Sequence, residues 1–378
     1  MQLEIDNRNT KIEEMLINMG PQHPSTHGVF KVLIETDGET VIKTESHIGF
    51  LHRCFEKVAE NMTYLQIHPY TDRLDYLAAM LMNFGYATAV EKLLDAQVPE
   101  RASYIRVIVA ELQRIASHLV AMGTYGLDLG AITPFLYAFR DRELILKFFE
   151  RICGQRLNYN YIRIGGVAFD LQPEMVSEIQ SFLDYVKPKI RELNDLLSYN
   201  GIFIDRTKNI GVISPEQAIA YGCTGPVLRG SGVKRDLRKD NPYSVYSRFE
   251  FDIPVGTGEV GQVGDCWDRY MVRMREMEES VKIIEQALKG LPSGDYCDPK
   301  LKKAIRPKGE VYHAIESARG EIGFHVIANG KNVPYRLKVR SPSFSNISIL
   351  DTLSPGHLLA DIVAIIGSLD IVMGEVDR

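Results

Sequence analysis

The fold of this chain follows from residues 99–123, PERASYIRVIVAELQRIASHLVAMG. Apolar side chains recur there every three or four residues, which is the spacing of a helix with a buried face. Pro99 suits the first turn of such a helix, and Gly123 suits its end. The stretch therefore predicts one long, deeply buried helix. The apolar positions in this pattern are Ile105, Ile108, Val109, Leu112, Ile115, Ala116, Leu119 and Met122.

Outward from this helix, the same periodicity predicts helices over residues 72–94 and 133–153, from 173 past Pro188, and from 265 onward, which together form a bundle. Strands are expected on both sides of the bundle. Residues 29–36 and 40–47 flank the turn dipeptide Asp37-Gly38, and residues 310–316, 323–328 and 335–340 precede a last helix at 355–367.

These elements predict an α+β fold in three parts. We expect an N-terminal β unit over residues 1–70, a helical core over 71–295, and C-terminal β hairpins with a helix and a buried tail over 296–378. The core contains a long Gly-rich stretch, residues 210–264. Its basic residues mark either a functional or partner-binding surface or a solvated loop. They are Arg229, Lys234, Arg235, Arg238 and Lys239.

Composition excludes several classes of protein. Of the 378 residues, 45% are hydrophobic and the net charge is −5, which argues against disorder and against nucleic-acid binding driven by charge. The longest apolar runs, such as 362–366, fall far short of the ~18 residues of a membrane span, and residues 1–10 are too polar for a signal peptide. We therefore expect a soluble chain, or one held at a membrane through partners.

Metal and nucleotide motifs are weak. None of the five cysteines forms a C-x₂₋₄-C pair, so no thiolate-bound metal is expected. Residues 256–261, GTGEVG, match G-x-G-x-x-G, but the helix and the second strand of a dinucleotide site do not follow at the required distances. A glycine-rich loop is the better interpretation.

Three segments could carry chemistry. Residues 20–28, GPQHPSTHG, display His23 and His27 from a rigid loop, either toward a cavity or as hydrogen-bonded structural residues. Tyr76, near the start of the predicted helix 72–94, could point into a cleft or be an ordinary core tyrosine. Asp128 follows the long helix among apolar neighbours, where a carboxylate needs a cation or donors, although it could also cap the next helix.

Motifs along the chain resemble one family, the quinone-site subunit of the proton-pumping NADH:quinone oxidoreductase, respiratory complex I. The match runs in order from about Leu16 to the last residue. The matching segments are GPQHPSTHG (20–28), GFLHRCFEKVAEN (49–61), YLQIHPYTDRLDY (64–76), LDLGAITPF (127–135), YIRIGGV (161–167), LRGSGVKRDLRK (228–239), ESARGE (316–321) and DIVAIIGSLDIVMGEVDR (361–378).

This family is similar in turn to the large subunit of nickel–iron hydrogenases, which hold their metal with two C-x-x-C motifs. Here residues 73–78 and 370–375 stand in those places without the cysteines. The resemblance therefore implies a hydrogenase-like fold whose cavity holds no metal and binds a quinone headgroup instead.

The resemblance also implies roles for particular residues. His27 and Tyr76 would donate hydrogen bonds to the two quinone carbonyl oxygens, and Asp128 would partner His27. His23 would shape the same loop, and Arg53 would lie near the terminal iron–sulfur cluster of a partner subunit. Imidazole and phenol suit this task, because reduced quinone oxygens need donors already aimed at them.

By the same resemblance, quinone is the substrate, and the iron–sulfur clusters and FMN belong to partner subunits. The implied partners are the iron–sulfur subunit with the terminal cluster, other peripheral-arm subunits and a membrane subunit where quinone enters. No nucleic acid is expected. The complex would lie on the cytoplasmic side of a bacterial inner membrane.

The chain departs from the family pattern at three positions. Cys54 stands where glycine is usual, Met62 where arginine is common, and Asn158 where many relatives have histidine beside the terminal cluster. A neutral amide cannot couple proton binding to cluster reduction. Three other functions remain as alternatives: a non-catalytic hydrogenase-like scaffold subunit, a metal-containing hydrogenase-like enzyme, and a stand-alone nicotinamide dehydrogenase.

Overall fold

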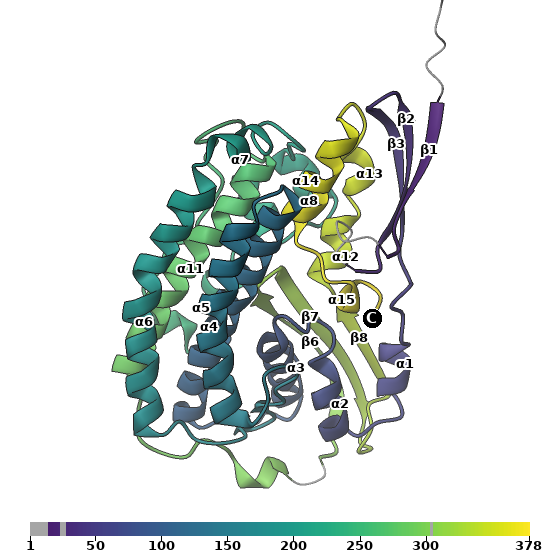
Figure 1. Ribbon diagram of the computed structural model, residues 1–378. Coiled ribbons are helices and arrows are strands. Elements are labelled where there is room, and N and C mark those ends of the chain that lie inside the picture. The colour runs from purple at the N-terminus through teal and green to yellow at the C-terminus, as the bar shows by residue number, and fades with distance from the viewer. Residues whose placement is uncertain (1–13, 23–27, 303–304) are drawn as a thin grey trace, which may run out of the picture.

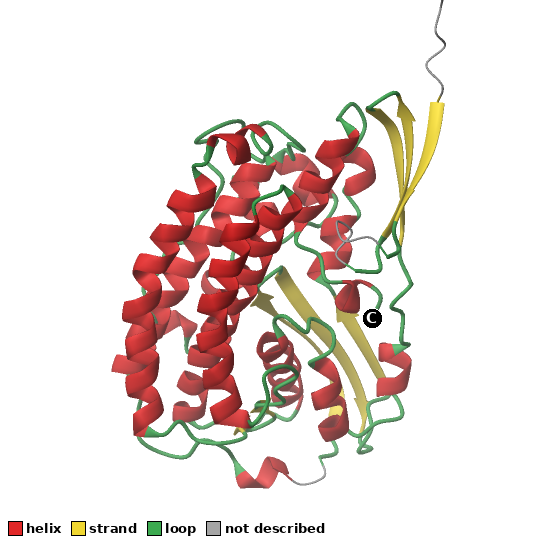
Figure 2. Cartoon of the chain, viewed as in Figure 1, coloured by secondary structure: helices red, strands yellow, loops and turns green. Residues whose placement is uncertain are grey.

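The computed structural model of the chain describes residues 14–22, 28–302 and 305–378 (Figure 1). Long helices run side by side along one side of this part of the chain, and two three-stranded sheets lie on the other (Figure 2). The long helices are α4 (Glu100–Asp128), α5 (Ile132–Cys153), α6 (Pro173–Leu193) and α11 (Cys266–Lys289). The predicted α+β class is confirmed.

Helix α4 is the centre of the bundle and packs against α5, α11 and α3 (Ala79–Leu93). It does not end at Gly123, as the sequence suggested, but continues to Asp128. A Cβ at position 123 would lie 3.3 Å from the Cβ of Ala138, so this glycine serves the close approach of α5. The residue that looked like a helix end is therefore a packing residue.

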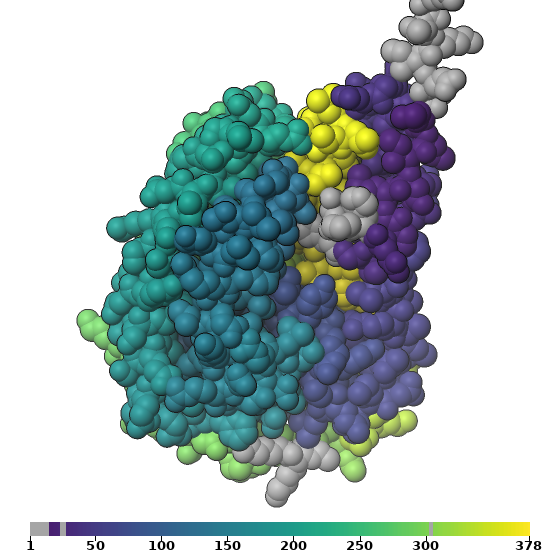
Figure 3. Space-filling model, viewed as in Figure 1, coloured from purple at the N-terminus to yellow at the C-terminus, as the bar shows by residue number. Residues whose placement is uncertain are grey.

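The N-terminal sheet is antiparallel in the order β1 (Glu14–Met19), β2 (Lys31–Asp37), β3 (Thr40–His47). Asp37 pairs with Thr40 across the turn predicted from the sequence. The buried face of the sheet shares a hydrophobic cluster with α14 (Leu359–Leu369). The C-terminal segment therefore lies between this sheet and the bundle (Figure 3).

The second sheet has the order β6 (Lys308–Ser317), β7 (Gly320–Asn329), β8 (Arg336–Arg340), all antiparallel. Helix α3 packs on β6 and β7. The contact is close at Gly85, where a Cβ would lie 2.9 Å from the Phe324 ring. The predicted C-terminal strands are therefore present, whereas the division of the chain into three parts stays a prediction.

Short elements connect these layers. They are α1 (Phe55–Ala59), α2 (Tyr64–Thr71), β4 (Ile162–Arg163), β5 (Gly166–Val167), α7 (Gly201–Asp205), α8 (Pro215–Ala220), α9 (Pro226–Gly230), α10 (Leu237–Asp240), α12 (Pro342–Ile347), α13 (Leu350–Leu353) and α15 (Met373–Val376). Helices α8 to α10 lie within the stretch 210–264. Within the described ranges, no helix combines the length and the apolar character needed to cross a membrane.

The helix predicted over residues 72–94 is wrong at its start. Helix α2 ends at Thr71, and α3 begins only at Ala79. Between them, Asp75 Oδ1 accepts the backbone N–H groups of Leu77 at 3.1 Å and Ala78 at 3.2 Å. Such an aspartate bond to the backbone competes with the helix ladder, so residues 72–78 form a turn.

Candidate functional site

Tyr76 lies in the turn between α2 and α3, and its side chain is partly open, with a relative exposure of 36%. Burial of its remaining surface and the neighbouring Asp75 carboxylate raise the pKa of Tyr76, while Arg319 lowers it. A phenol in this setting keeps its proton at neutral pH. It can donate a hydrogen bond, and it gives up its proton only to a strongly basic oxygen.

A buried ion pair fixes this turn from behind. Asp75 Oδ2 lies 2.7 Å from Arg319 Nη1, and both side chains are buried. Arg319 also donates to Ser117 Oγ of α4 at 3.0 Å and to the Asp370 carbonyl oxygen at 3.0 Å. One guanidinium group therefore joins the Tyr76 turn, the central helix and the C-terminal tail.

The C-terminal tail packs directly against the same turn. Gly374 stands in α15, and a Cβ at this position would lie 2.6 Å from the carbonyl oxygen of Leu74. The Asp377 carboxylate accepts the backbone N–H groups of Gly49 at 2.8 Å and Leu51 at 2.7 Å. The tail is therefore held between the residues before α1 and the Tyr76 turn.

Arg53 connects the turn and the tail from outside. Its Nη2 donates to the Arg73 carbonyl oxygen at 2.7 Å and lies 3.4 Å from the Gly374 carbonyl oxygen. The guanidinium carbon is 5.9 Å from the centre of the Tyr70 ring, which is within cation–π range. Arg53 thus places a positive charge beside the turn that carries Tyr76.

A polar hollow of about 370 Å³ opens beside the turn, and Arg73 and Arg163 give it positive charge. Asn158 and Asn160 also line it, and both have left-handed backbones, with φ of 57° and 45°. The Asp72 carboxylate accepts the Asn160 backbone N–H at 2.9 Å. Burial raises the pKa of Asp72 to about 7. The hollow therefore has a cationic lining, and the buried carboxyl group of Asp72 holds the loop that contains Asn158 and Asn160.

Asp128 is the last residue of α4 and is half-buried. It follows Ser117, the residue of α4 that contacts Arg319, by eleven positions, so it lies about 16 Å along the helix axis from that contact. His23 and His27 lie outside the described residues. The structure therefore brings Arg53 to the turn that carries Tyr76 and places Asp128 at the end of α4, close to Gly367 of α14. The pairing of Asp128 with His27 stays a prediction.

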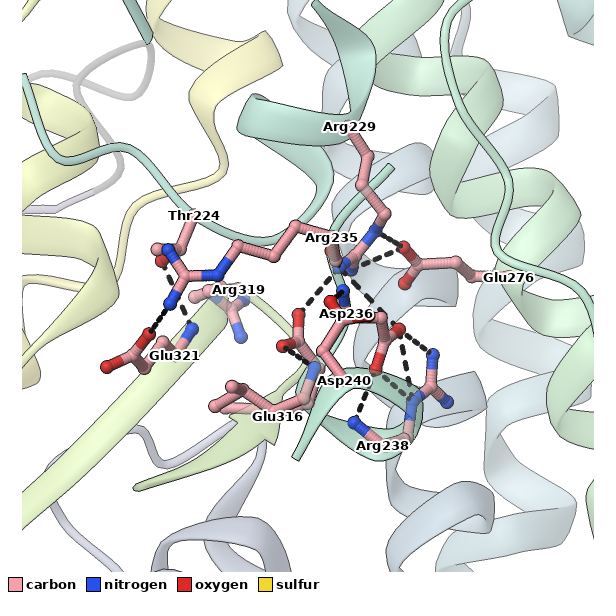
Figure 4. A network of polar contacts seen from close by, with 12 residues as sticks. Thr224, Arg229, Arg235, Asp236, Arg238, Asp240, Glu276, Glu316, Arg319 and Glu321 are labelled. Carbon is pink, nitrogen blue, oxygen red and sulfur yellow. Dashed lines mark hydrogen bonds and ion pairs between the residues drawn. The ribbon is translucent and has the colours of Figure 1, made fainter. Parts of the chain in front are cut away.

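A second cluster of buried charges lies between α4, α9, α11 and β6 (Figure 4). Arg229 Nη2 is 2.6 Å from Glu276, and its Nη1 is 2.7 Å from Glu316. Arg238 Nη1 is 3.1 Å from Glu111. Arg229 and Arg238 are fully buried. These two residues belong to the interior, so neither of the surface roles expected for the basic stretch 210–264 describes them.

The comparisons with known proteins agree with one another. A profile described as "Respiratory-chain NADH dehydrogenase, 49 Kd subunit" matches residues 128–306 and 300–378. The D subunit of the NADH-quinone oxidoreductase of Chlorobium luteolum is 55% identical over 370 residues, which is 97% of this chain and 94% of the relative. The D subunits of the enzymes from Desulforamulus reducens and Bacillus cytotoxicus are 53% and 51% identical over 368 residues, covering 97% of this chain and 99% of each relative. The chain belongs to this family.

As a member of the 49 kDa subunit family, the chain is a subunit of NADH:quinone oxidoreductase, and the resemblance seen in the sequence is confirmed. In the part of the chain that the structure describes, no three His, Cys, Asp or Glu side chains gather in a way that could hold a metal ion.

The structure shows what one departure from the implied family pattern costs. Cys54 has a φ of 54°, in the left-handed region where a side chain is strained and glycine is preferred. The glycine that the resemblance implies at this position would adopt this backbone without strain, and Cys54 adopts it at some cost. Met62 is half-buried against the main core.

Sequence reasoning missed the charges behind the site, above all Arg319 and its partner Asp370. A signal for buried charge was available in the long helix, because Glu111, Arg114 and His118 are spaced by three and four residues, which places them on one face. Their burial shows that the apolar core of the bundle contains a stripe of ionisable side chains.

Proposed function

We propose that this chain, together with an iron–sulfur partner subunit, forms the site at which quinone is reduced. The observation that carries the proposal is the Tyr76 phenol, which is partly exposed, keeps its proton and stands on a turn fixed by the Asp75–Arg319 pair. A donor held in place before the reaction is what the developing charge on a quinone oxygen requires.

In this proposal Tyr76 donates a hydrogen bond to one quinone carbonyl oxygen, and His27 donates to the other. Asp128 partners His27 and stabilises its charged form, and His23 shapes the loop. As each quinone oxygen becomes basic, these groups supply the proton at the phenol oxygen and at the imidazole nitrogen. The assignments follow the family resemblance, residue by residue.

Electrons would come from the terminal iron–sulfur cluster of the partner, docked near the polar hollow. The hollow supports this placement through the charges of Arg73 and Arg163, and Arg53, from the segment before α1, donates a hydrogen bond to the Arg73 carbonyl oxygen. Nearby cations favour the reduced form of a cluster, which carries additional negative charge. NADH oxidation at FMN would take place on other peripheral-arm subunits.

We further propose that the chain lies peripherally on the cytoplasmic side of a bacterial inner membrane, where it contacts a membrane subunit at the point of quinone access. Proton translocation would occur in membrane subunits and be coupled to quinone reduction through the His27–Asp128 pair.

The test is to measure the rate of quinone reduction in the assembled complex with Tyr76→Phe or His27→Ala. We expect quinone reduction to fall by about 10²-fold or more, which is typical for the loss of a positioned acid, while subunit content and NADH oxidation by an artificial acceptor at the flavin remain normal. If both variants assemble and reduce quinone at the unaltered rate, the chain is a non-catalytic scaffold and the proposal is wrong.

A further inference from the structure

Three buried carboxyl groups face two buried guanidinium groups behind the Tyr76 turn. The carboxyl groups belong to Asp75, Asp370 and Glu375, and the guanidinium groups to Arg273 and Arg319. With every group ionised, these five groups carry one more negative than positive charge, and Glu276 and Arg269, two further buried groups that act on Arg273, add one charge of each sign. Such an excess charge is costly, and the usual outcome is that one carboxyl group binds a proton.

The contacts identify which carboxyl group this is. Asp75 is 2.7 Å from Arg319, and Asp370 is 3.2 Å from Arg319 and 3.5 Å from Arg273. Glu375 is different. Its Oε1 accepts from the backbone N–H of Ser343 at 3.1 Å and from the Ser343 hydroxyl, and its buried Oε2 has no partner among the described residues. Within the cluster, Glu375 is thus the carboxyl group without an ion pair.

We propose that Glu375 carries a proton in the resting complex and that its protonation state sets how readily Tyr76 donates to quinone. Glu375 is a positioning residue in this role, because it acts on Tyr76 through the shared cation Arg319. The inference rests on the proposed function of Tyr76.

The electrostatic link has two steps. The charge of Arg319 lowers the pKa of Tyr76, and the charge of Asp75 raises it. An ionised Glu375 would draw on the same guanidinium group and add negative charge next to Asp75. Both effects make the Tyr76 phenol a weaker acid, so ionisation of Glu375 should slow proton donation.

The surroundings agree with a bound proton. Burial and the Asp75 carboxylate raise the pKa of Glu375 to about 8, against the lowering effect of the Ser343 donors and Arg319. Among the described residues, the charged groups that approach Glu375 or the backbone of α15 from neighbouring elements include Asp75, Arg319 and Arg53, with Asp370 and Arg273 beyond Arg319.

The experiment is the pH profile of quinone reduction by the assembled complex with Glu375→Gln. The amide has the size of the carboxyl group but does not titrate. We expect kcat/KM of the unaltered complex to fall by up to about tenfold between pH 7 and pH 9 as Glu375 ionises, and the variant to lose this alkaline decline. NADH oxidation by an artificial acceptor serves as the control for pH effects at the flavin.

Ser343→Ala provides a second, independent variant. It removes a donor that favours the ionised form of Glu375, so the alkaline decline should move to higher pH. An unchanged alkaline decline in Glu375→Gln, or an unmoved or lowered one in Ser343→Ala, would overturn the inference. Tyr76→Phe in the same assay separates the two proposals. Full quinone-reduction activity of that variant would contradict the proposed function itself. Loss of activity in Tyr76→Phe, together with an unchanged pH profile in Glu375→Gln, would contradict only the role of Glu375.

Discussion

Replacing Arg319 with methionine tests the charge cluster that fixes the Tyr76 turn. Arg319 is buried and donates to Asp75 Oδ2 at 2.7 Å, Ser117 Oγ at 3.0 Å and the Asp370 carbonyl oxygen at 3.0 Å. Methionine keeps much of the side-chain volume of Arg319 but leaves the buried carboxylates of Asp75 and Asp370 without the positive charge that Arg319 supplies. Breaking a buried ion pair in this way costs about 3–5 kcal/mol, and we expect a loss of that size in the free energy of unfolding at pH 8.

The loss should depend on pH in a defined direction. The pKa of Asp75 is raised by burial even with Arg319 present, and it rises further without the guanidinium group. A carboxyl group with a raised pKa in the folded state destabilises that state by about 1.4 kcal/mol per pH unit as pH rises from its unfolded pKa to its folded pKa, and the loss is constant above that. The destabilisation by Arg319→Met should therefore be smaller at pH 5 than at pH 8.

Denaturant unfolding of the full chain at both pH values measures these free energies. The double variant Arg319→Met with Asp75→Asn removes the uncompensated charge along with its partner, so it should recover about 1 kcal/mol or more at pH 8. A cost below about 1 kcal/mol for Arg319→Met, or a cost that is the same at pH 5 and pH 8, would refute this reasoning about the cluster.

Two further predictions concern the hollow and the tail. Because Asn158 is a neutral amide, the reduction potential of the partner's terminal cluster should change little between pH 6 and pH 8. In Asn158→His, that potential should depend on pH. A redox titration that finds a steep pH dependence of the potential in the unaltered complex would contradict this prediction. Gly374→Ala places a Cβ 2.6 Å from the Leu74 carbonyl oxygen and should cost about 1–3 kcal/mol in denaturant unfolding, whereas Gly201→Ala, with open space around it, should be nearly neutral. Equal stabilities of the two alanine variants would show that the tail is not packed against the turn.

Local patterns predicted the large elements. The apolar spacing around Ile105 to Met122 indicated the central helix, and Asp37-Gly38 indicated the N-terminal hairpin, because both depend on residues close in the sequence. The helix predicted over 72–94 was wrong at its start, since the bonds from Asp75 to two backbone N–H groups outweigh the apolar spacing. Gly123 looked like a helix end because its contact with α5 is invisible in the local sequence.

The buried ion pairs around the site could not be predicted from local sequence patterns. Arg229 and Arg238 looked like surface residues of a basic loop, because Glu276 and Glu111, which pair with them in the interior, lie far away in the sequence; Asp236, the other partner of Arg238, lies two residues from it. Tyr76 alone was more typical of a core tyrosine, and its role was predicted only through the family motif around it. The structure adds the contact that holds its turn, which is the ion pair of Asp75 with Arg319, a residue distant in the sequence.

A structure of the assembled complex with a quinone-site inhibitor bound tests the central claim most directly. We expect the density of the inhibitor headgroup to place one oxygen within about 3 Å of the Tyr76 hydroxyl, with the iron–sulfur partner closing the site. A headgroup bound elsewhere, with the Tyr76 hydroxyl covered by protein alone, would contradict the proposed function.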